Sequence, residues 1–396
     1  MESRYDSLRR DAIRIYGSIL KDQQIFDSFS PVEPDSRGWI QEIVLGSLRY
    51  RTRIESLIRF YSKKQPPKLK AIQFLTLAGY QVLTAKEEHR AKAVSQWVEL
   101  SKSELGKNQS GFVNFQLRRF ADEKVRADFF SDEKPDWSES EFEWYCLPKW
   151  AYEKLKKEQG EAWVRDFALS SLEKPTTWKR NLAKVESSLY TAGSELADNE
   201  IIQGISSQKS VDLVSQSIDG YSGKTIIDVC AAPGGKAIAM AALGGNVTAT
   251  DQNQRRLERV LENVNRVNLS INVKPFDEAF TGEYELVWVD APCMAFGTLR
   301  KNPEAKWIRG EAKLNELFEV QIGILNRASG LCTDNGHLVY TVCSPFQLEG
   351  GTVVEHFLEN HPDFKLDKKW RVALNEYEGA EGFQGFLLSK SSSNSS

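Results

Sequence analysis

Residues 225–243 read TIIDVCAAPGGKAIAMAAL, and this stretch decides the fold class. A short β-branched run leads through a proline and two glycines into an alanine-rich run that is typical of a helix. The alternation recurs downstream in VTATD then RRLERVLENVNRV (247–267), ELVWVD then LNELFEVQIGILNRASGL (285–331), and HLVYTV then VVEHFLEN (337–360). It predicts an α/β domain with a mostly parallel sheet and helices on both faces.

The N-terminal part of the chain follows a different pattern. Up to about residue 120 it shows helical periodicity without convincing strands, and one helical face carries Ile72, Leu75, Gly79, Val82 and Leu83. We predict an all-α bundle over residues 1–125. Between Ala121 and Glu143 acidic residues outnumber basic ones nine to three, so residues 126–143 are predicted to be an acidic linker.

Composition limits the class of protein. The chain has 396 residues, of which 41% are hydrophobic, which is enough for two or three domains with substantial cores. It has no signal-peptide-like run and no apolar stretch of membrane-spanning length, so we expect a cytoplasmic protein that does not enter a membrane. The five cysteines form no CxxC pair, and reduced thiols are expected. We expect a monomer.

The loop from Cys230 to Lys236 predicts a ligand site. Such a loop between a strand and a helix presents backbone N–H groups to a ligand, and its two glycines allow close approach. It fits neither a Walker loop nor a GxGxxG fingerprint, which argues against phosphate ligands. Asp251 ends the next strand, where acidic residues bind ribose hydroxyls. A nucleoside without a pyrophosphate fits best, such as S-adenosylmethionine, with Lys236 facing its carboxylate.

Two cysteines follow buried strands. Cys293 comes just after ELVWVD, which ends at Asp290, and Cys343 comes just after HLVYTV. The carboxyl ends of these strands meet at one edge of the sheet, so both thiols are predicted to flank the ligand pocket. A thiolate that adds to C6 of a pyrimidine activates C5 for methylation, and Asp290 is placed to hold the base at N3 or N4. A lone cysteine is more often a packing residue, but two beside an aspartate favour catalysis. The residues alone do not rank the two thiols.

A metal centre is not expected. Cys332, His337 and Cys343 can be grouped, but their spacing matches no zinc pattern. Cys332 is therefore predicted to be inert.

Several motifs in order carry a resemblance to a known family. DVCAAPGGK (228–236), ATDQN (249–253), DAPCMAFGTLRKNPEAKW (290–307) and YTVCSPFQLEG (340–350) resemble the motif series of the Nop2/Sun RNA 5-methylcytosine methyltransferases. The resemblance covers residues 144–390. It implies an RNA-facing subdomain over 144–215 and a Rossmann-like, S-adenosylmethionine-dependent core over 216–390. Residues 391–396 read SSSNSS, and this polar composition predicts a disordered tail. The helical part resembles a NusB-like RNA-binding domain.

The resemblance assigns roles residue by residue. It implies that Cys343 is the nucleophile, that Cys293 assists release of the methylated base, and that Asp290 lies between cofactor and base. It further implies that Asp251 binds the cofactor ribose and that Asp277 lies by the adenine. The residues expected to contact the methionine part are Cys230, Ala231, Ala232, Pro233, Gly234, Gly235 and Lys236. The chain departs from the family pattern at Met294, Ala295, Val342 and Gly350.

The expected partner is RNA, with small-subunit ribosomal RNA as the first choice. The segment from Arg49 to Lys70 has eight basic residues and one acidic residue, and we expect it to contact phosphates. Further phosphate contacts are expected from Arg118, Arg119, Lys179 and Arg180. The expected reaction is methylation of C5 of a cytosine that is extruded from a loop. Two alternatives stay open: the same chemistry on transfer RNA, and an RNA-binding assembly factor that has lost catalysis.

Overall fold

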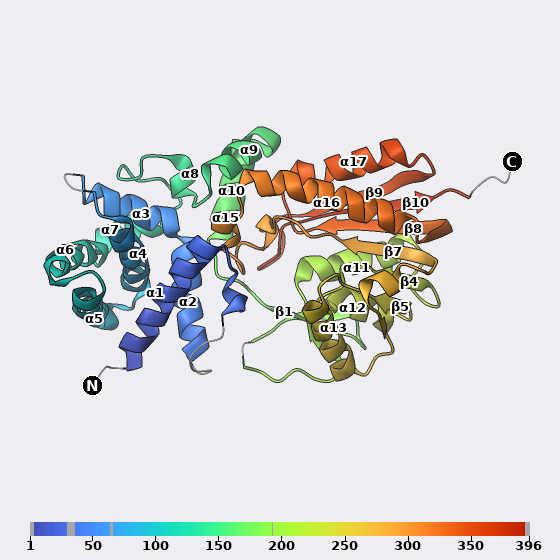
Figure 1. The fold of residues 1–396 in the computed structure, drawn as a ribbon, viewed down its shortest axis with the longest axis horizontal. Helices are drawn as coiled ribbons and strands as arrows, with labels where there is room; N and C mark the ends of the chain where they lie inside the picture. The colour runs from blue at the N-terminus through green and yellow to red at the C-terminus, as the bar shows by residue number, and fades with distance from the viewer. Residues whose placement is uncertain (1–3, 30–35, 64–65, 192, 393–396) are drawn as a thin grey trace. The chain divides into compact units, whose positions relative to one another are not determined.

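The computed structural model describes residues 4–29, 36–63, 66–191 and 193–392 (Figure 1). Its contacts divide the chain into two compact units. The first comprises Met1–Glu173 and Leu299–Gly310, and the second comprises Lys174–Thr298 and Glu311–Ser396. Most of the predicted tail, residues 393–396, lies outside the described residues.

The first unit is helical throughout its described part. Its helices are α1 (Arg4–Asp22), α2 (Arg37–Arg49), α3 (Arg51–Phe60), α4 (Leu69–Thr84), α5 (Glu87–Glu104), α6 (Ser110–Phe120), α7 (Glu123–Phe130), α8 (Glu141–Trp144), α9 (Lys149–Gln159), α10 (Glu161–Ser171) and α15 (Ala305–Ile308), with short 3-10 turns η1 (Phe26–Ser28) and η3 (Lys107–Gln109). One apolar cluster runs through α1 to α8 and includes the fully buried Trp97 and Phe120. The all-α prediction for this part is confirmed.

Residues 126–143 differ from the predicted acidic linker. α7 is capped by Asp122, whose side chain accepts from the N–H of Val125 at 3.2 Å. Phe129 and Trp137 are buried in the core of the first unit and stack with ring centroids 6.5 Å apart. Most acidic side chains of this segment are exposed, but the buried Phe129 and Trp137 rings join it to the core of the first unit.

Residues 299–310 were expected in the methyltransferase core but cluster with the helical unit. Arg49 donates to the carbonyl of Arg300 at 2.7 Å, and Lys306 donates to the carbonyl of Arg49 at 3.1 Å. The indole N–H of Trp307 donates to the carbonyl of Leu48 at 2.7 Å. Buried polar groups of this kind hold a segment firmly because each would be costly to leave unpaired.

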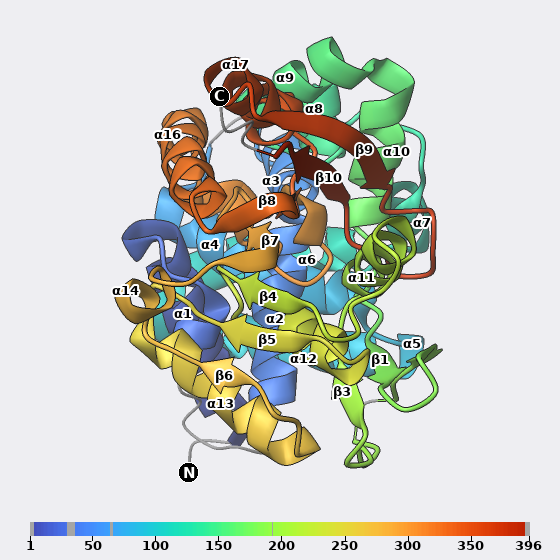
Figure 2. The same ribbon diagram turned by 90° about the vertical axis from the view of Figure 1, so that its right-hand side faces the viewer.

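The second unit is built on a mostly parallel sheet. Its described strands are β4 (Thr225–Asp228), β5 (Asn246–Ala249), β6 (Asn272–Val273), β7 (Tyr284–Asp290), β8 (Cys332–Val342), β9 (Phe364–Val372) and β10 (Phe383–Lys390). They are ordered β6-β5-β4-β7-β8-β10-β9, and β10 pairs antiparallel with both β8 and β9. Figure 2 shows these strands one above another. The predicted Rossmann-like fold is confirmed.

Helices cover both faces of this sheet. They are α11 (Ile205–Ser217), α12 (Gly235–Ala242), α13 (Gln254–Val267), α14 (Phe276–Ala279), α16 (Glu311–Ser329) and α17 (Gly351–Asn360), with 3-10 turns η4 (Phe296–Thr298) and η5 (Gln347–Glu349). Alternate residues of a strand enter different cores: Ile226 and Trp288 pack with α11 to α13, whereas Ile227 and Val289 pack with α16 and α17. This two-sided burial explains the near-continuous apolar runs of β4 and β7.

A small second sheet precedes the core. It has the order β2-β1-β3 and consists of β1 (Trp178–Asn181), β2 (Glu186–Leu189) and β3 (Glu200–Ile202). Its strands lie within the predicted subdomain 144–215, but residues up to Glu173 cluster with the first unit instead. Across the described residues, no helix is long and apolar enough to cross a membrane.

Candidate active site

The candidate site lies at the carboxyl ends of β4, β7 and β8. The strand order reverses beside β4, because β5 and β6 lie on one side of it and β7 and β8 on the other. Ligands of open α/β sheets bind in the crevice at such a switch point. β4 ends at Asp228, β7 at Asp290 and β8 at Val342, so the glycine loop, Cys293 and Cys343 all follow strand ends at this edge.

The two expected catalytic thiols lie together. The Sγ atoms of Cys293 and Cys343 are 3.4 Å apart, and both side chains are partly exposed. The hydrogen bond to Cys343 and burial raise the pKa of Cys293 well above that of a free thiol. Cys293 therefore keeps its proton at neutral pH and is suited to donate a hydrogen bond to the neighbouring sulfur.

Asp290 links the cofactor loop to β8. Its Oδ2 accepts from Nζ of Lys236 at 2.5 Å, and its Oδ1 accepts from the hydroxyl of Thr341 at 2.9 Å. Although burial lowers the pKa of Lys236, Asp290 and Asp228 outweigh it, and the pKa of Lys236 is raised. Lys236 thus lies charged beside Asp290, and its expected contact with a cofactor carboxylate stays a prediction.

Asp228 is a site residue that the sequence motifs alone do not single out. Its side chain is fully buried, and neither carboxylate oxygen has a partner at ordinary hydrogen-bonding geometry, although the amide of Ala237 favours the charged form. Burial raises the pKa of Asp228 to about 7, against the opposing charge of Lys236. A second carboxyl group therefore interacts with the charges of Lys236 and Asp290 and titrates near neutral pH.

Glu349 joins the two cysteine loops. It lies within the motif YTVCSPFQLEG (340–350), but that motif gives no sign of this role. Its buried carboxylate accepts from the N–H of Met294 at 2.8 Å through Oε1 and from the hydroxyl of Ser344 through Oε2. Met294 follows Cys293 and Ser344 follows Cys343. One side chain therefore fixes the separation of the two sulfurs.

The glycine loop offers room and unpaired polar atoms for a ligand. Gly234 has φ +102°, a conformation that favours glycine, and α12 begins directly after it. A Cβ added to Gly235 would lie 3.5 Å from Nε2 of Gln203. Both side-chain polar atoms of Gln203 are buried without a partner. Because buried polar atoms are normally paired, the loop fits a polar ligand such as the methionine part of S-adenosylmethionine.

Asp251 and Asp277 differ in their surroundings. Asp251 is buried at the end of β5, and its Oδ1 accepts from the N–H of Asn253 at 3.0 Å while Arg256 lies 3.5 Å from Oδ2. The side chain of Asp277 is 92% exposed on α14 and pairs with Arg327 at 3.2 Å. No described contact joins Asp277 to the cysteines or the glycine loop.

The remaining thiols near the sheet are poor nucleophiles. Burial and the charges of Asp251 and Asp290 raise the pKa of Cys230 far above its ordinary value. Burial raises the pKa of Cys332, the first residue of β8, to about 12. Within the described residues, no group of three His, Cys, Asp or Glu side chains is placed to hold a metal ion.

Two departures from the family pattern have structural consequences. Ala295 has φ +58°, in the left-handed region where glycine is favoured. A Cβ added to Gly350 would lie 2.4 Å from Oε1 of Gln384, whose amide group donates to the carbonyl of Ser344 at 2.6 Å. Gly350 therefore leaves space for a side chain that supports the Cys343 loop.

Much of the basic segment expected to contact RNA is used internally. Arg53 is buried and donates to the carbonyls of Trp144 at 2.5 Å and Phe129 at 2.9 Å. Arg51 pairs with Glu55 at 2.8 Å, and Lys64 lies outside the described residues. In the second unit Arg180 is buried against Asp212 at 2.6 Å. Arg53 and Arg180 are therefore structural, and the expectation that they contact phosphates is wrong.

Comparison with known proteins agrees with both units. Residues 216–386 match the family described as 16S rRNA methyltransferase RsmB/F, and residues 8–122 match the NusB family. The chain joins an RsmB/F-type methyltransferase domain to a NusB-type domain. This match confirms the expected S-adenosylmethionine-dependent methyltransferase class.

Relatives share this arrangement over nearly the whole chain. The "Probable ribosomal RNA small subunit methyltransferase B" of Bacillus subtilis is 28% identical, covering 91% of this chain and 86% of the relative. The "Ribosomal RNA small subunit methyltransferase B" of Serratia proteamaculans is 27% identical over 97% of this chain and 98% of the relative.

Solved structures confirm the fold. The crystal structure of the protein PH0851 has a TM-score of 0.70 at 23% identity and covers 98% of this chain and 100% of its own. A methyltransferase homologue from Pyrococcus horikoshii has a TM-score of 0.52 at 19% identity and covers 62% of this chain and 96% of its own.

Proposed function

We propose that the RsmB/F-type domain methylates C5 of a cytosine in small-subunit ribosomal RNA. The observation that carries this proposal is the 3.4 Å separation of the Cys293 and Cys343 sulfurs, beside Asp290, at the switch point of the sheet. The names of the relatives support ribosomal RNA as the substrate.

Cys343 acts as the nucleophile. Its thiolate adds to C6 of the cytosine, which moves electron density to C5 and makes that carbon reactive. Bound S-adenosylmethionine supplies an electrophilic methyl group. Loss of the C5 proton then restores the double bond and expels the Cys343 sulfur. Cys343 is partly exposed, so a base extruded from RNA has access to it.

Cys293 assists the release step. Because its raised pKa keeps the thiol protonated, it donates a hydrogen bond to the Cys343 sulfur as that sulfur leaves with a negative charge. Glu349 holds both loops at the required separation. The two thiols are therefore assigned different roles, which their sequence positions alone do not distinguish.

Asp290 and Lys236 orient the base. A carboxylate accepts a hydrogen bond from the exocyclic amino group of cytosine, which uracil lacks. Thr341 and Lys236 hold the Asp290 carboxylate from two sides. The positive charge of Lys236 also stabilises negative charge that develops on the base during addition of the thiolate.

The cofactor is held by the loop from Cys230 to Lys236 and by Asp251. The loop and the unpaired amide of Gln203 would bind the methionine part, and the buried carboxylate of Asp251 would accept from the ribose hydroxyls. Asp277 remains a proposal for the adenine end, supported only by its position after β6.

The proposal is tested by methyl transfer from labelled S-adenosylmethionine to unmodified small-subunit ribosomal RNA, with nuclease mapping. We expect label on one cytosine, and none with Cys343→Ala. Label on transfer RNA alone would reassign the substrate. No label on either RNA, with RNA binding intact, would favour a non-catalytic assembly factor and refute the proposal.

A further inference from the structure

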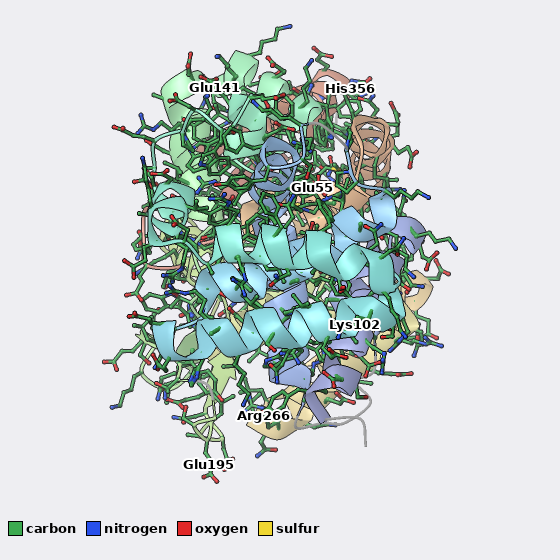
Figure 3. The ribbon with its side chains drawn as sticks, turned by 90° about the vertical axis from the view of Figure 1, so that its left-hand side faces the viewer. Glu55, Lys102, Glu141, Glu195, Arg266 and His356 are labelled. Atoms are coloured by element: carbon green, nitrogen blue, oxygen red, sulfur yellow. The ribbon has the colours of Figure 1, made fainter. Side chains whose placement is uncertain are left out.

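A groove of about 950 Å³ on the NusB-type unit has the composition of a nucleic-acid site. It lies among the end of α3, the start of α4, the end of α5 and the start of α6, and we call it the aromatic groove. The residues that line it include Phe60, Tyr61, Phe115, Lys63, Lys68 and Lys70. Lys102, labelled in Figure 3, is near the end of α5 that borders it.

Two of the three rings, Phe60 and Phe115, are exposed, and Tyr61 is partly buried; the rings do not stack on one another. Phe60 is 36% exposed and Phe115 is 44% exposed. Phe60 and Tyr61 meet at 73°, and Tyr61 and Phe115 meet at 89°. A folded domain that only needed a core would bury such rings. Exposed rings gathered in a hollow mark an interaction site.

Cations surround these rings. Nζ of Lys63 lies 4.9 Å from the Phe60 ring centre, and the guanidinium of Arg119 lies 5.8 Å from Tyr61 and 5.5 Å from Phe115. Lys63, Lys68 and Lys70 are all exposed. The acidic lining residue Glu104 pairs with Arg10 at 2.9 Å, so the groove favours an anionic ligand.

We propose that the aromatic groove binds a single-stranded segment of the RNA substrate, a step that rests on the proposed function. Exposed rings stack on unpaired bases while lysines contact the adjoining phosphates, which is how single strands are bound without a fixed sequence. A protein partner fits less well, because lysine is depleted at protein interfaces. The groove would thus contribute to RNA affinity rather than to the methyl-transfer chemistry.

The test compares paired variants of the full chain. Phe60→Ala with Phe115→Ala removes two rings, and Lys63→Ala with Lys68→Ala removes two charges. Tyr5→Ala with Lys21→Ala removes an exposed ring and an exposed charge on α1, outside the groove. Circular dichroism checks that each variant is folded, and the lysine pair keeps the test valid if the ring variant unfolds.

Two readouts separate this proposal from the proposed function. Affinity for a single-stranded oligoribonucleotide should fall at least about fivefold in the ring variant, near the low end for loss of one stacking ring. The slope of log affinity against log salt should shrink by about 0.7 per lysine removed. KM for RNA should rise with kcat unchanged. The α1 control should behave as wild type.

Ultraviolet crosslinking locates the contact without requiring activity. We expect crosslinked peptides that contain residues 60–61 or 115. If both groove variants bind RNA as wild type does and the crosslinks lie elsewhere, the proposal that the aromatic groove binds RNA is wrong, even if methylation is confirmed. Variants that bind free RNA normally but lose binding to a ribosomal protein would overturn it in favour of a protein partner. Intact groove binding without methylation would instead refute only the proposed function.

Discussion

The carboxylate of Glu349 bonds to the residues that follow Cys293 and Cys343, and the two sulfurs lie 3.4 Å apart. Two loops from different strands are thereby held by one buried side chain. A reaction that uses both thiols on a single base depends on this separation, since a misplacement of about 1 Å can cost about a hundredfold in rate.

Glu349→Gln should therefore lower kcat by about ten- to a hundredfold. The amide cannot accept from both Met294 and Ser344, so the loops lose their fixed spacing, whereas cofactor binding is left intact. Steady-state kinetics should show the loss in kcat with an unchanged KM for S-adenosylmethionine. Glu304→Gln is the matched control, because Glu304 is a buried carboxyl group in the first unit. Equal loss of kcat in both variants would show a general packing effect.

Asp228→Asn should change how stability depends on pH. In the folded protein the pKa of Asp228 is raised to about 7, whereas in the unfolded chain it is about 3.9. Between these two pH values the folded protein binds a proton that the unfolded chain has lost. The contribution of this group to the free energy of unfolding therefore falls as pH rises from about 4 to about 7 and is constant above that range. Asparagine does not titrate, so the Asp228→Asn variant lacks this decrease in the free energy of unfolding.

Urea denaturation near pH 5 and near pH 8 tests this sign. The stability of Asp228→Asn relative to wild type should be greater at the higher pH. The groups that face Asp228, namely Lys236, Asp290 and Asp251, are present in both proteins. A difference between the two proteins that does not change with pH would contradict the raised pKa.

Ala295→Gly should stabilise the second unit slightly. Relief of the left-handed conformation is worth about 1–2 kcal/mol, and the flexibility of glycine costs about 0.5–1 kcal/mol, so a gain of roughly 0.5 kcal/mol is expected. Ala241→Gly, inside helix α12, should instead destabilise by about 1 kcal/mol. Thermal or urea unfolding that shifts in the same direction for both variants would disprove strain at Ala295.

Arg53→Leu should reduce stability rather than act through RNA affinity. The guanidinium lies 3.6 Å from the Trp144 ring centre and donates to two buried carbonyls. Leaving these acceptors unpaired costs about 1–3 kcal/mol each. The urea midpoint should fall clearly, whereas exposed Lys68→Ala should stay within about 0.5 kcal/mol of wild type. A folded Arg53→Leu protein of normal stability with weakened RNA binding would restore the phosphate interpretation.

Local sequence patterns predict the α/β core well, because an apolar run typical of a strand leads up to several of the polar residues that form the site. The runs before Asp228, Asp290 and Cys343 are strands that meet at one edge, and the two thiols are together as expected. Spacing along the chain cannot reveal which carboxylate links them. The motif YTVCSPFQLEG contains Glu349, but only the folded contacts show that it links the two loops.

Charge counts mislead where side chains turn inward. Arg53 and Arg180 read as surface cations, yet both are buried with partners far along the chain. Phe129 and Trp137 lie in an acidic stretch that reads as a linker, yet they fill the core of the first unit. In each case tertiary contacts decide the burial, and composition averaged over a window does not register them.

The most direct test of the central claim is covalent trapping with Cys293→Ala. Incubated with S-adenosylmethionine and small-subunit ribosomal RNA, this variant should accumulate a protein–RNA adduct that survives denaturing electrophoresis. The adduct should map to Cys343 and disappear in Cys293→Ala/Cys343→Ala. Normal turnover by Cys293→Ala without an adduct, or an adduct that persists in the double variant, would contradict the assigned roles of the two thiols.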